Sequence, residues 1–141
     1  MTEKQFDVVN KAKHYNTHPS EVECIEIVRH LPFALGSAFK YVFRREGKES
    51  VRSLNSAMYY LKDYHNMMDR VPDWATVSLT PIEWSLMHKV AAYEPNEVAK
   101  SFYLAFIAYL IRPEADEYKW LTSILGRLTA EAVEATNAEG C

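Results

Sequence analysis

The chain has 141 residues, which suggests one domain, and its 48% hydrophobic and 25% charged residues are ordinary for a globular protein. A net charge of −3 argues against general binding to the phosphate backbone of long nucleic acids, whereas a small anionic ligand needs only a local basic cluster. The chain starts without an apolar signal region, and its longest apolar run, around 102–111, is too short for an ordinary membrane span. We therefore expect a cytoplasmic protein that binds no membrane.

Helix signals follow one another from residue 20 onward. Ser20 and Glu23 match a capping-box pattern, which predicts a helix that starts at Ser20 and is ended by Pro32. Helix boundary residues and apolar spacing predict further helices over 33–45, 50–71, 80–93, 95–111 and 114–135. Ahead of them, we expect a short extended piece at 6–9 and a polar loop at 11–16.

The predicted helix over 95–111 is apolar almost all round, which is typical of a helix at the centre of a fold or buried in an oligomer. We therefore expect an all-α fold in which residues 1–141 form a single compact domain of about six helices. The surplus of aromatic residues favours a homo-oligomer, and a monomer with a buried central helix fits as well.

The predicted helix over 33–45 separates into an apolar side and a polar side at 100° per residue. Lys40 and Arg44 are four residues apart on the polar side, so their charged groups are neighbours and can bind one phosphate together. Gly36 lies on the same side and would let a ligand or another helix approach the backbone. The alternative is structural, because cations near a helix C-terminus also complement the helix dipole.

Four fragments favour the ligand-binding interpretation when they are taken together. They are 13–15 (KHY), 22–27 (VECIEI), 36–44 (GSAFKYVFR) and 57–61 (AMYYL). Their order and spacing over residues 11–64 resemble the P-loop-less phage nucleotide kinases, whereas the C-terminal half, 72–141, has no recognised match. Carried over residue by residue, the resemblance implies a nucleotide site made of His14, Tyr15, Glu23, Glu26, Lys40, Tyr41 and Arg44, to which we add Ser37 of the same predicted helix.

The resemblance implies a role for each residue type in this site. Lys40 and Arg44 would hold phosphate, Tyr15 or Tyr41 would stack on a base, and His14 would bond phosphate or move a proton. Glu23 and Glu26 would receive donors from the base or sugar, or orient the cations. Each has a structural alternative too: a helix cap for Glu23, a surface charge for Glu26, and core packing for the tyrosines.

The chain differs from the pattern of this family at positions where phosphoryl transfer would need charged side chains. Ser37 replaces an asparagine, the turn at 45–48 is one residue longer, and Ser53 and Ser56 replace an aspartate and a lysine. There is no Gly-rich phosphate loop of the Walker type. We therefore expect a phage protein that sequesters a nucleotide, such as a cyclic immune signal of the host, without turnover. A nucleoside monophosphate kinase and a helical module that inhibits a host protein are the alternatives.

Metal-dependent chemistry has weaker support in the sequence. The pairs Glu23/Glu26 and Glu131/Glu134 have the one-turn spacing of an all-helical pyrophosphohydrolase, but such pairs are common on solvated helices. His14 and His18 lie in a loop without further ligands nearby, and Cys24 and Cys141 do not suggest a zinc site or a disulfide. We expect no metal and no cofactor, with Cys24 as an inert core thiol.

Overall fold

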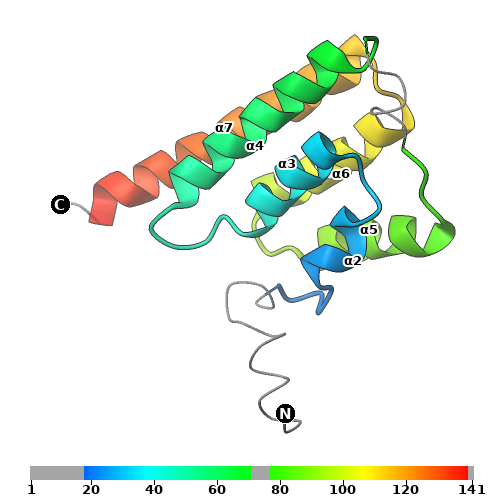
Figure 1. Cartoon of the computed structure of the whole chain (residues 1–141). Helices are drawn as coiled ribbons and strands as arrows, with labels where there is room; N and C mark the ends of the chain where they lie inside the picture. Colours follow the sequence, from blue (N-terminus) through cyan, green and yellow to red (C-terminus); the bar gives the residue numbers. More distant parts are fainter. Residues whose placement is uncertain (1–17, 71–76, 140–141) are drawn as a thin grey trace, which may run out of the picture.

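The computed structural model describes residues 18–70 and 77–139, and within these ranges the chain is helical, with no strand (Figure 1). The six helices are α2 (Cys24–Val28), α3 (Phe33–Phe43), α4 (Ser50–Met67), α5 (Pro81–Tyr93), α6 (Glu97–Ile111) and α7 (Ala115–Glu139). The prediction of an all-α, single-domain fold with about six helices is confirmed.

The helices lie in three layers of two (Figure 1). The long helices α4 and α7 run side by side in opposite directions, α3 and α6 lie beneath them, and α2 contacts α5 in the third layer. Each half of the chain therefore follows one plan, in which a helix of the outer layer leads to a central helix and then to a long one. The halves meet layer by layer, so the fold needs both of them to close its core.

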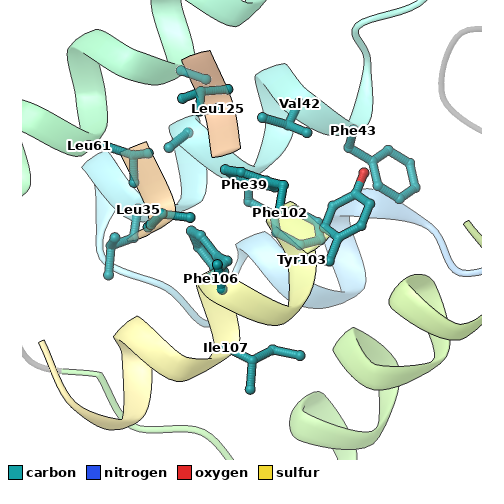
Figure 2. Close-up of a cluster of buried hydrophobic side chains, with 14 of the residues drawn as sticks. Leu35, Phe39, Val42, Phe43, Leu61, Phe102, Tyr103, Phe106, Ile107 and Leu125 are labelled. Atoms are coloured by element: carbon teal, nitrogen blue, oxygen red, sulfur yellow. The ribbon is translucent and has the colours of Figure 1, made fainter. Parts of the chain in front are cut away.

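Aromatic side chains of the central layer fill the core (Figure 2). Phe39 of α3 packs against Tyr103 and Phe106 of α6, with ring centroids 5.5 Å apart in both pairs. Phe102 and Tyr109 of α6 are also fully buried. Burial of such rings is a large apolar contribution to folding, which explains why the almost wholly apolar α6 lies at the centre.

The first helix begins later than Ser20 and is built differently from the prediction. Glu23 is its N-cap, and the Glu26 carboxylate accepts a hydrogen bond from the Glu23 backbone N–H at 2.8 Å. Glu21 has a φ of 64°, in the left-handed region, which a right-handed helix cannot include. Ser20 is instead buried in the preceding turn, where its hydroxyl accepts the Val22 backbone N–H.

Other boundaries move by a few residues. The third predicted helix ends at Met67, the fifth begins at Glu97 because Asn96 caps it, and the last continues to Glu139. The segments predicted as extended (6–9) and as a polar loop (11–16) fall outside the described residues. In the ranges that are described, no helix is long and apolar enough to cross a membrane.

Gly36 allows α2 and α3 to pack closely. A Cβ atom at this position would lie 3.2 Å from the Val28 carbonyl oxygen and 3.7 Å from the Leu31 Cβ. That oxygen belongs to the backbone, so the approach needs a residue without a side chain. The helix-packing interpretation of Gly36 accounts for its place in the sequence.

Candidate functional site

Lys40 and Arg44 lie one turn apart on α3, partly exposed, beside the beginning of α2. Cys24 is the first residue of α2, and its thiol interacts electrostatically with both charges. The two cations therefore lie close to the start of α2. Burial raises the pKa of Cys24 to about 11, and the two cations work in the opposite direction. The thiol is therefore protonated and buried, as expected of an inert core cysteine. The two positive charges lie together where α3 contacts the start of α2.

Two parallel tyrosine rings lie next to Lys40. Tyr41 of α3 and Tyr60 of α4 have ring centroids 6.0 Å apart and an angle of 8° between their planes. The Lys40 Nζ lies 4.9 Å from the centre of the Tyr41 ring, in cation–π range. We name Lys40, Tyr41, Arg44 and Tyr60 the cationic–aromatic face.

Tyr60 was missing from the site residues chosen from the sequence. It lies in the fragment 57–61 that supported the family resemblance, but only the packing of α4 on α3 shows that it pairs with Tyr41. Tyr60 also meets Phe33 and Tyr59 edge-on, and both of those side chains are mostly exposed, at 69% and 64%. Exposed aromatic surface therefore extends from the cations along α3 and α4.

The other predicted residues are placed unequally around this face. Ser37 is buried on α3, one turn before Lys40 and Tyr41. Glu23 and Glu26 bond with each other's backbone at the start of α2, so capping accounts for both carboxylates. His14 and Tyr15 lie outside the described residues. The structure therefore brings Ser37, Lys40, Tyr41 and Arg44 together on one helix.

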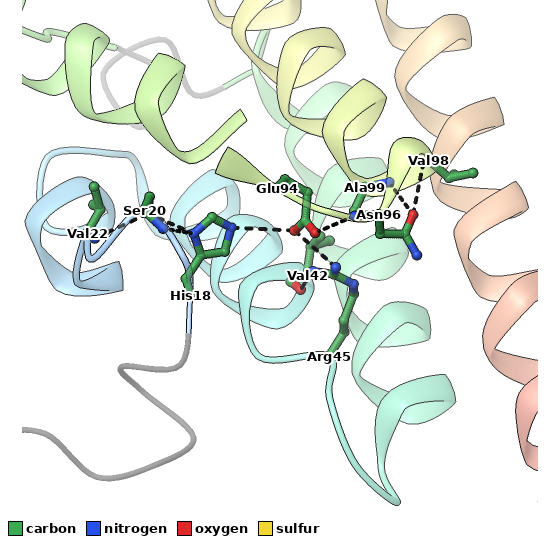
Figure 3. Close-up of polar contacts among 9 residues, drawn as sticks. All are labelled: His18, Ser20, Val22, Val42, Arg45, Glu94, Asn96, Val98 and Ala99. Atoms are coloured by element: carbon green, nitrogen blue, oxygen red, sulfur yellow. Dashed lines mark hydrogen bonds and ion pairs between the residues drawn. The ribbon is translucent and has the colours of Figure 1, made fainter. Parts of the chain in front are cut away.

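A buried polar cluster joins the two halves of the molecule (Figure 3). The Arg45 guanidinium donates to the Glu94 carboxylate at 3.0 Å and to the Val42 carbonyl at 3.1 Å. His18 approaches the same carboxylate from the other side, with its Nε2 at 3.5 Å, longer than an ordinary hydrogen bond. The Ser20 backbone N–H donates to His18 Nδ1, which leaves Nε2 to carry the proton that faces Glu94. Sequence reasoning missed this cluster.

The Glu94 carboxylate is held in its charged form. Burial by itself raises the pKa of Glu94, but the contact with His18, the Asn96 backbone N–H and the Arg45 guanidinium outweigh it, so the pKa lies below its ordinary value. The Glu94 side chain is 2% exposed and that of Arg45 is 10% exposed. This is a nearly dry ion pair between the end of α3 and the turn before α6.

A cavity of about 520 Å³ lies beside this ion pair. Residues of the α3–α4 turn, the α5–α6 turn and the C-terminal part of α7 line it, including Arg45, Lys48, Glu94, Asn96 and Glu131. None of the four residues of the cationic–aromatic face is among its lining residues. The molecule therefore has two distinct candidate regions, and the face carries the concentration of positive charge and stacked rings.

The carboxylate pairs considered for a metal site do not come together. Glu23 and Glu26 cap α2, whereas the Glu131 carboxylate on α7 accepts a hydrogen bond from the Asn96 side chain at 3.2 Å. Across residues 18–70 and 77–139 there is no group of three or more His, Cys, Asp or Glu side chains that could hold a metal ion. The pyrophosphohydrolase alternative therefore gains no support from this geometry.

Comparison with known families corrects the resemblance inferred from the four fragments. Residues 9–62 match the family DUF3310, described as a protein of unknown function, and nothing shows membership of a phage nucleotide kinase family. No curated protein and no solved structure matches the chain. The fragments were misleading because two of their acidic residues are explained by capping of α2, and their helical spacing is common to many α-helical proteins. The match covers α2, α3 and most of α4, up to residue 62, and so includes every residue of the cationic–aromatic face.

Proposed function

We propose that the protein binds a phosphorylated nucleotide at the cationic–aromatic face and sequesters it without turnover. The observation that carries this proposal is the placement of Lys40 and Arg44 one turn apart beside the parallel rings of Tyr41 and Tyr60. A nucleotide combines an anionic phosphate with an aromatic base, so it needs both kinds of surface close together.

The phosphate would be held by the two cations. An arginine can offer two parallel hydrogen bonds to phosphate oxygens, and a neighbouring lysine adds a mobile point charge. Lys40 already lies over the Tyr41 ring, so it can exchange that cation–π contact for a phosphate oxygen without a change in the backbone. The rest of the protein has a net negative charge, which favours a small anion at this local cluster over a long nucleic acid.

The base would stack on a tyrosine ring. Base–aromatic stacking contributes about 1–3 kcal/mol per base and tolerates different bases, because every base has a π-face. Tyr60 is partly exposed and borders the exposed rings of Phe33 and Tyr59, so a base would meet a wider aromatic surface there. Cyclic and linear nucleotides both fit this chemistry, and a cyclic immune signal is the ligand that we would test first. We expect the protein to act in the cytoplasm of the host, where such nucleotides occur, and as a homo-oligomer.

The test is thermal unfolding in the presence of mono-, di- and triphosphate nucleotides and cyclic dinucleotides. A ligand at 100 times its dissociation constant should stabilise the folded protein by about 2.7 kcal/mol. We expect Lys40→Ala and Arg44→Ala to abolish this shift, and Tyr60→Ala to weaken binding of nucleotides far more than binding of inorganic pyrophosphate. Lys62→Ala removes an exposed cation from α4 and serves as the matched control, which should bind normally.

Two further readouts separate sequestration from its alternatives. Mass spectrometry of the ligand recovered after denaturation should return it unchanged, whereas a new phosphorylated product would indicate an enzyme. Absence of a shift with every nucleotide at millimolar concentration would overturn the proposal. A helical protein-interaction module would then account best for the exposed Tyr93, Ile111 and Trp120 of the C-terminal half.

A further inference from the structure

The cavity beside the Arg45–Glu94 ion pair has fixed polar walls. Arg45 is bonded to Glu94 and to the Val42 carbonyl, and the second Glu94 oxygen accepts the Asn96 backbone N–H at 3.0 Å. Asn96 itself caps α6 through two further hydrogen bonds. Walls held in this way lose little conformational freedom when a ligand arrives, which favours binding.

Two exposed charges of opposite sign line the same cavity from different elements. Lys48 belongs to the α3–α4 turn and Glu131 to α7, and the two do not form an ion pair with each other. Glu131 bonds only to the neutral Asn96 side chain, and Lys48 has no ion pair with any residue in 18–70 or 77–139. Each charge is therefore available to a ligand, at separate points of one cavity.

The balance of charge at the cavity decides which class of ligand fits. Arg45 and Glu94 neutralise each other, which leaves Lys48 against the exposed carboxylates of Glu46 and Glu131. A simple anion would meet one cation and two carboxylates, so the lining disfavours it. A molecule with an ammonium group as well as an acidic group satisfies both signs.

Part of the remaining lining is apolar, beside the hydroxyl side chains of Ser50 and Thr136, and the size suits a small molecule. Leu54 of α4, Pro95 of the α5–α6 turn, and Leu128 and Ala132 of α7 contribute apolar surface. The volume of about 520 Å³ is within the ordinary range of small-molecule pockets, roughly 300–1,000 Å³. An apolar body attached beside the two charged groups would cover this surface.

We propose that this cavity binds a small zwitterion with an apolar body, of the amino-acid class. Its carboxylate faces Lys48, its ammonium group faces Glu131, and its apolar part lies on Leu54, Leu128 and Ala132. The proposal does not depend on nucleotide binding, because the cavity and the cationic–aromatic face have no residue in common.

The experiment is isothermal titration calorimetry of the full chain with L-leucine and L-phenylalanine. Two analogues of leucine test the need for both charges: 4-methylpentanoate lacks the ammonium group, and isoamylamine lacks the carboxylate. We expect both amino acids to bind, and both leucine analogues to bind at least about tenfold more weakly than leucine, since each loses one charge-assisted contact. If either analogue binds as tightly as leucine, the ligand does not need both charges and the zwitterion proposal is wrong. If neither amino acid binds at 10 mM, the cavity is not a site for this class of ligand.

Four variants place the ligand in the cavity. Lys48→Ala and Glu131→Ala should each weaken binding about tenfold, for the same reason. The matched controls Lys62→Ala and Glu134→Ala remove exposed charges from α4 and α7 that do not line the cavity, and should bind normally. Normal binding by both cavity variants would overturn the assignment. Lys48→Ala should also keep any nucleotide-induced thermal shift, so failure of one proposal is distinguishable from failure of the other.

Discussion

The two halves of the molecule share one arrangement of helices but place their aromatic side chains differently. In the first half, Phe33 and Tyr59 are largely exposed on α3 and α4. In the second half, Phe102, Phe106 and Tyr109 of α6 are completely buried. The division is not complete, because Phe39 of the first half is buried and Tyr93 and Trp120 of the second half are exposed. The difference therefore lies between α6, which supplies most of the packed rings, and the surface of α3 and α4, where exposed rings lie near cations.

The halves also differ in how their helices begin. In the second half, Thr80 and Asn96 cap α5 and α6 through their side chains. In the first half, α3 and α4 follow Pro32 and Glu49, which make no side-chain cap bond. The second half is therefore better specified by local interactions, and the first depends more on contacts made across the fold.

Glu94 forms a buried ion pair between the halves, so its replacement is a direct way to weaken their association. Glu94→Ala leaves Arg45 and His18 without the carboxylate that they share in a nearly dry environment. Removing one partner of a buried pair costs about 3–5 kcal/mol, and we expect about 3 because Arg45 also borders the cavity. Urea unfolding of the full chain measures the loss.

Acid adds a second test of the same contact. The pKa of folded Glu94 is below its ordinary value, so its stabilising effect is complete above the unfolded pKa of about 4.5 and is lost as the pH falls through the folded pKa. Glu94→Gln should therefore reduce the decline in stability below about pH 4.5, while Glu134→Ala serves as an exposed control. Unchanged stability in Glu94→Ala would show that this carboxylate does not hold the halves together, and that the apolar core and the His65–Tyr109 hydrogen bond suffice.

Removal of the Asn96 N-cap tests whether side-chain caps stabilise the helices of the second half. The Asn96 side chain accepts hydrogen bonds from the backbone N–H groups of Val98 and Ala99, at 2.9 and 3.0 Å. Asn96→Ala should lower the free energy of unfolding by about 1 kcal/mol, within the range of 0.5–2 for such caps. Denaturant unfolding measures this free energy. Asn55→Ala, on the exposed surface of α4, should change the free energy of unfolding little. Equal losses in the two variants would contradict a capping role.

The smallest expected effect concerns the strained turn of the first half. Glu21 is exposed and has a left-handed φ of 64°, which costs an L-residue energy that glycine does not pay. Glu21→Gly should raise stability by up to about 1 kcal/mol, less the entropy that glycine loses on folding. Glu21→Ala keeps the strain and should not stabilise. A similar gain in both variants, seen as a rise in the unfolding midpoint, would show that strain at this residue is not the cause.

The sequence by itself determined which segments are helical and which helix lies at the centre. Prolines and glycines mark helix boundaries through local backbone sterics, and the continuous apolar surface of α6 can be satisfied only by burial. The sequence also predicted that the side chains of Lys40 and Arg44 are neighbours, because their one-turn spacing depends on helix geometry alone. Errors arose at helix ends, as at Ser20, where the left-handed Glu21 delays α2 until Cys24.

Only the tertiary structure decided which distant residues meet. Arg45 and Glu94 are 49 residues apart, and neither the pairing nor the cavity beside it has a local signature. The same holds for Tyr41 and Tyr60, whose parallel rings come from the packing of α4 on α3. Contacts within one helix follow from its fixed period, whereas contacts between helices depend on how all the apolar surfaces are buried together, and that is a property of the whole chain.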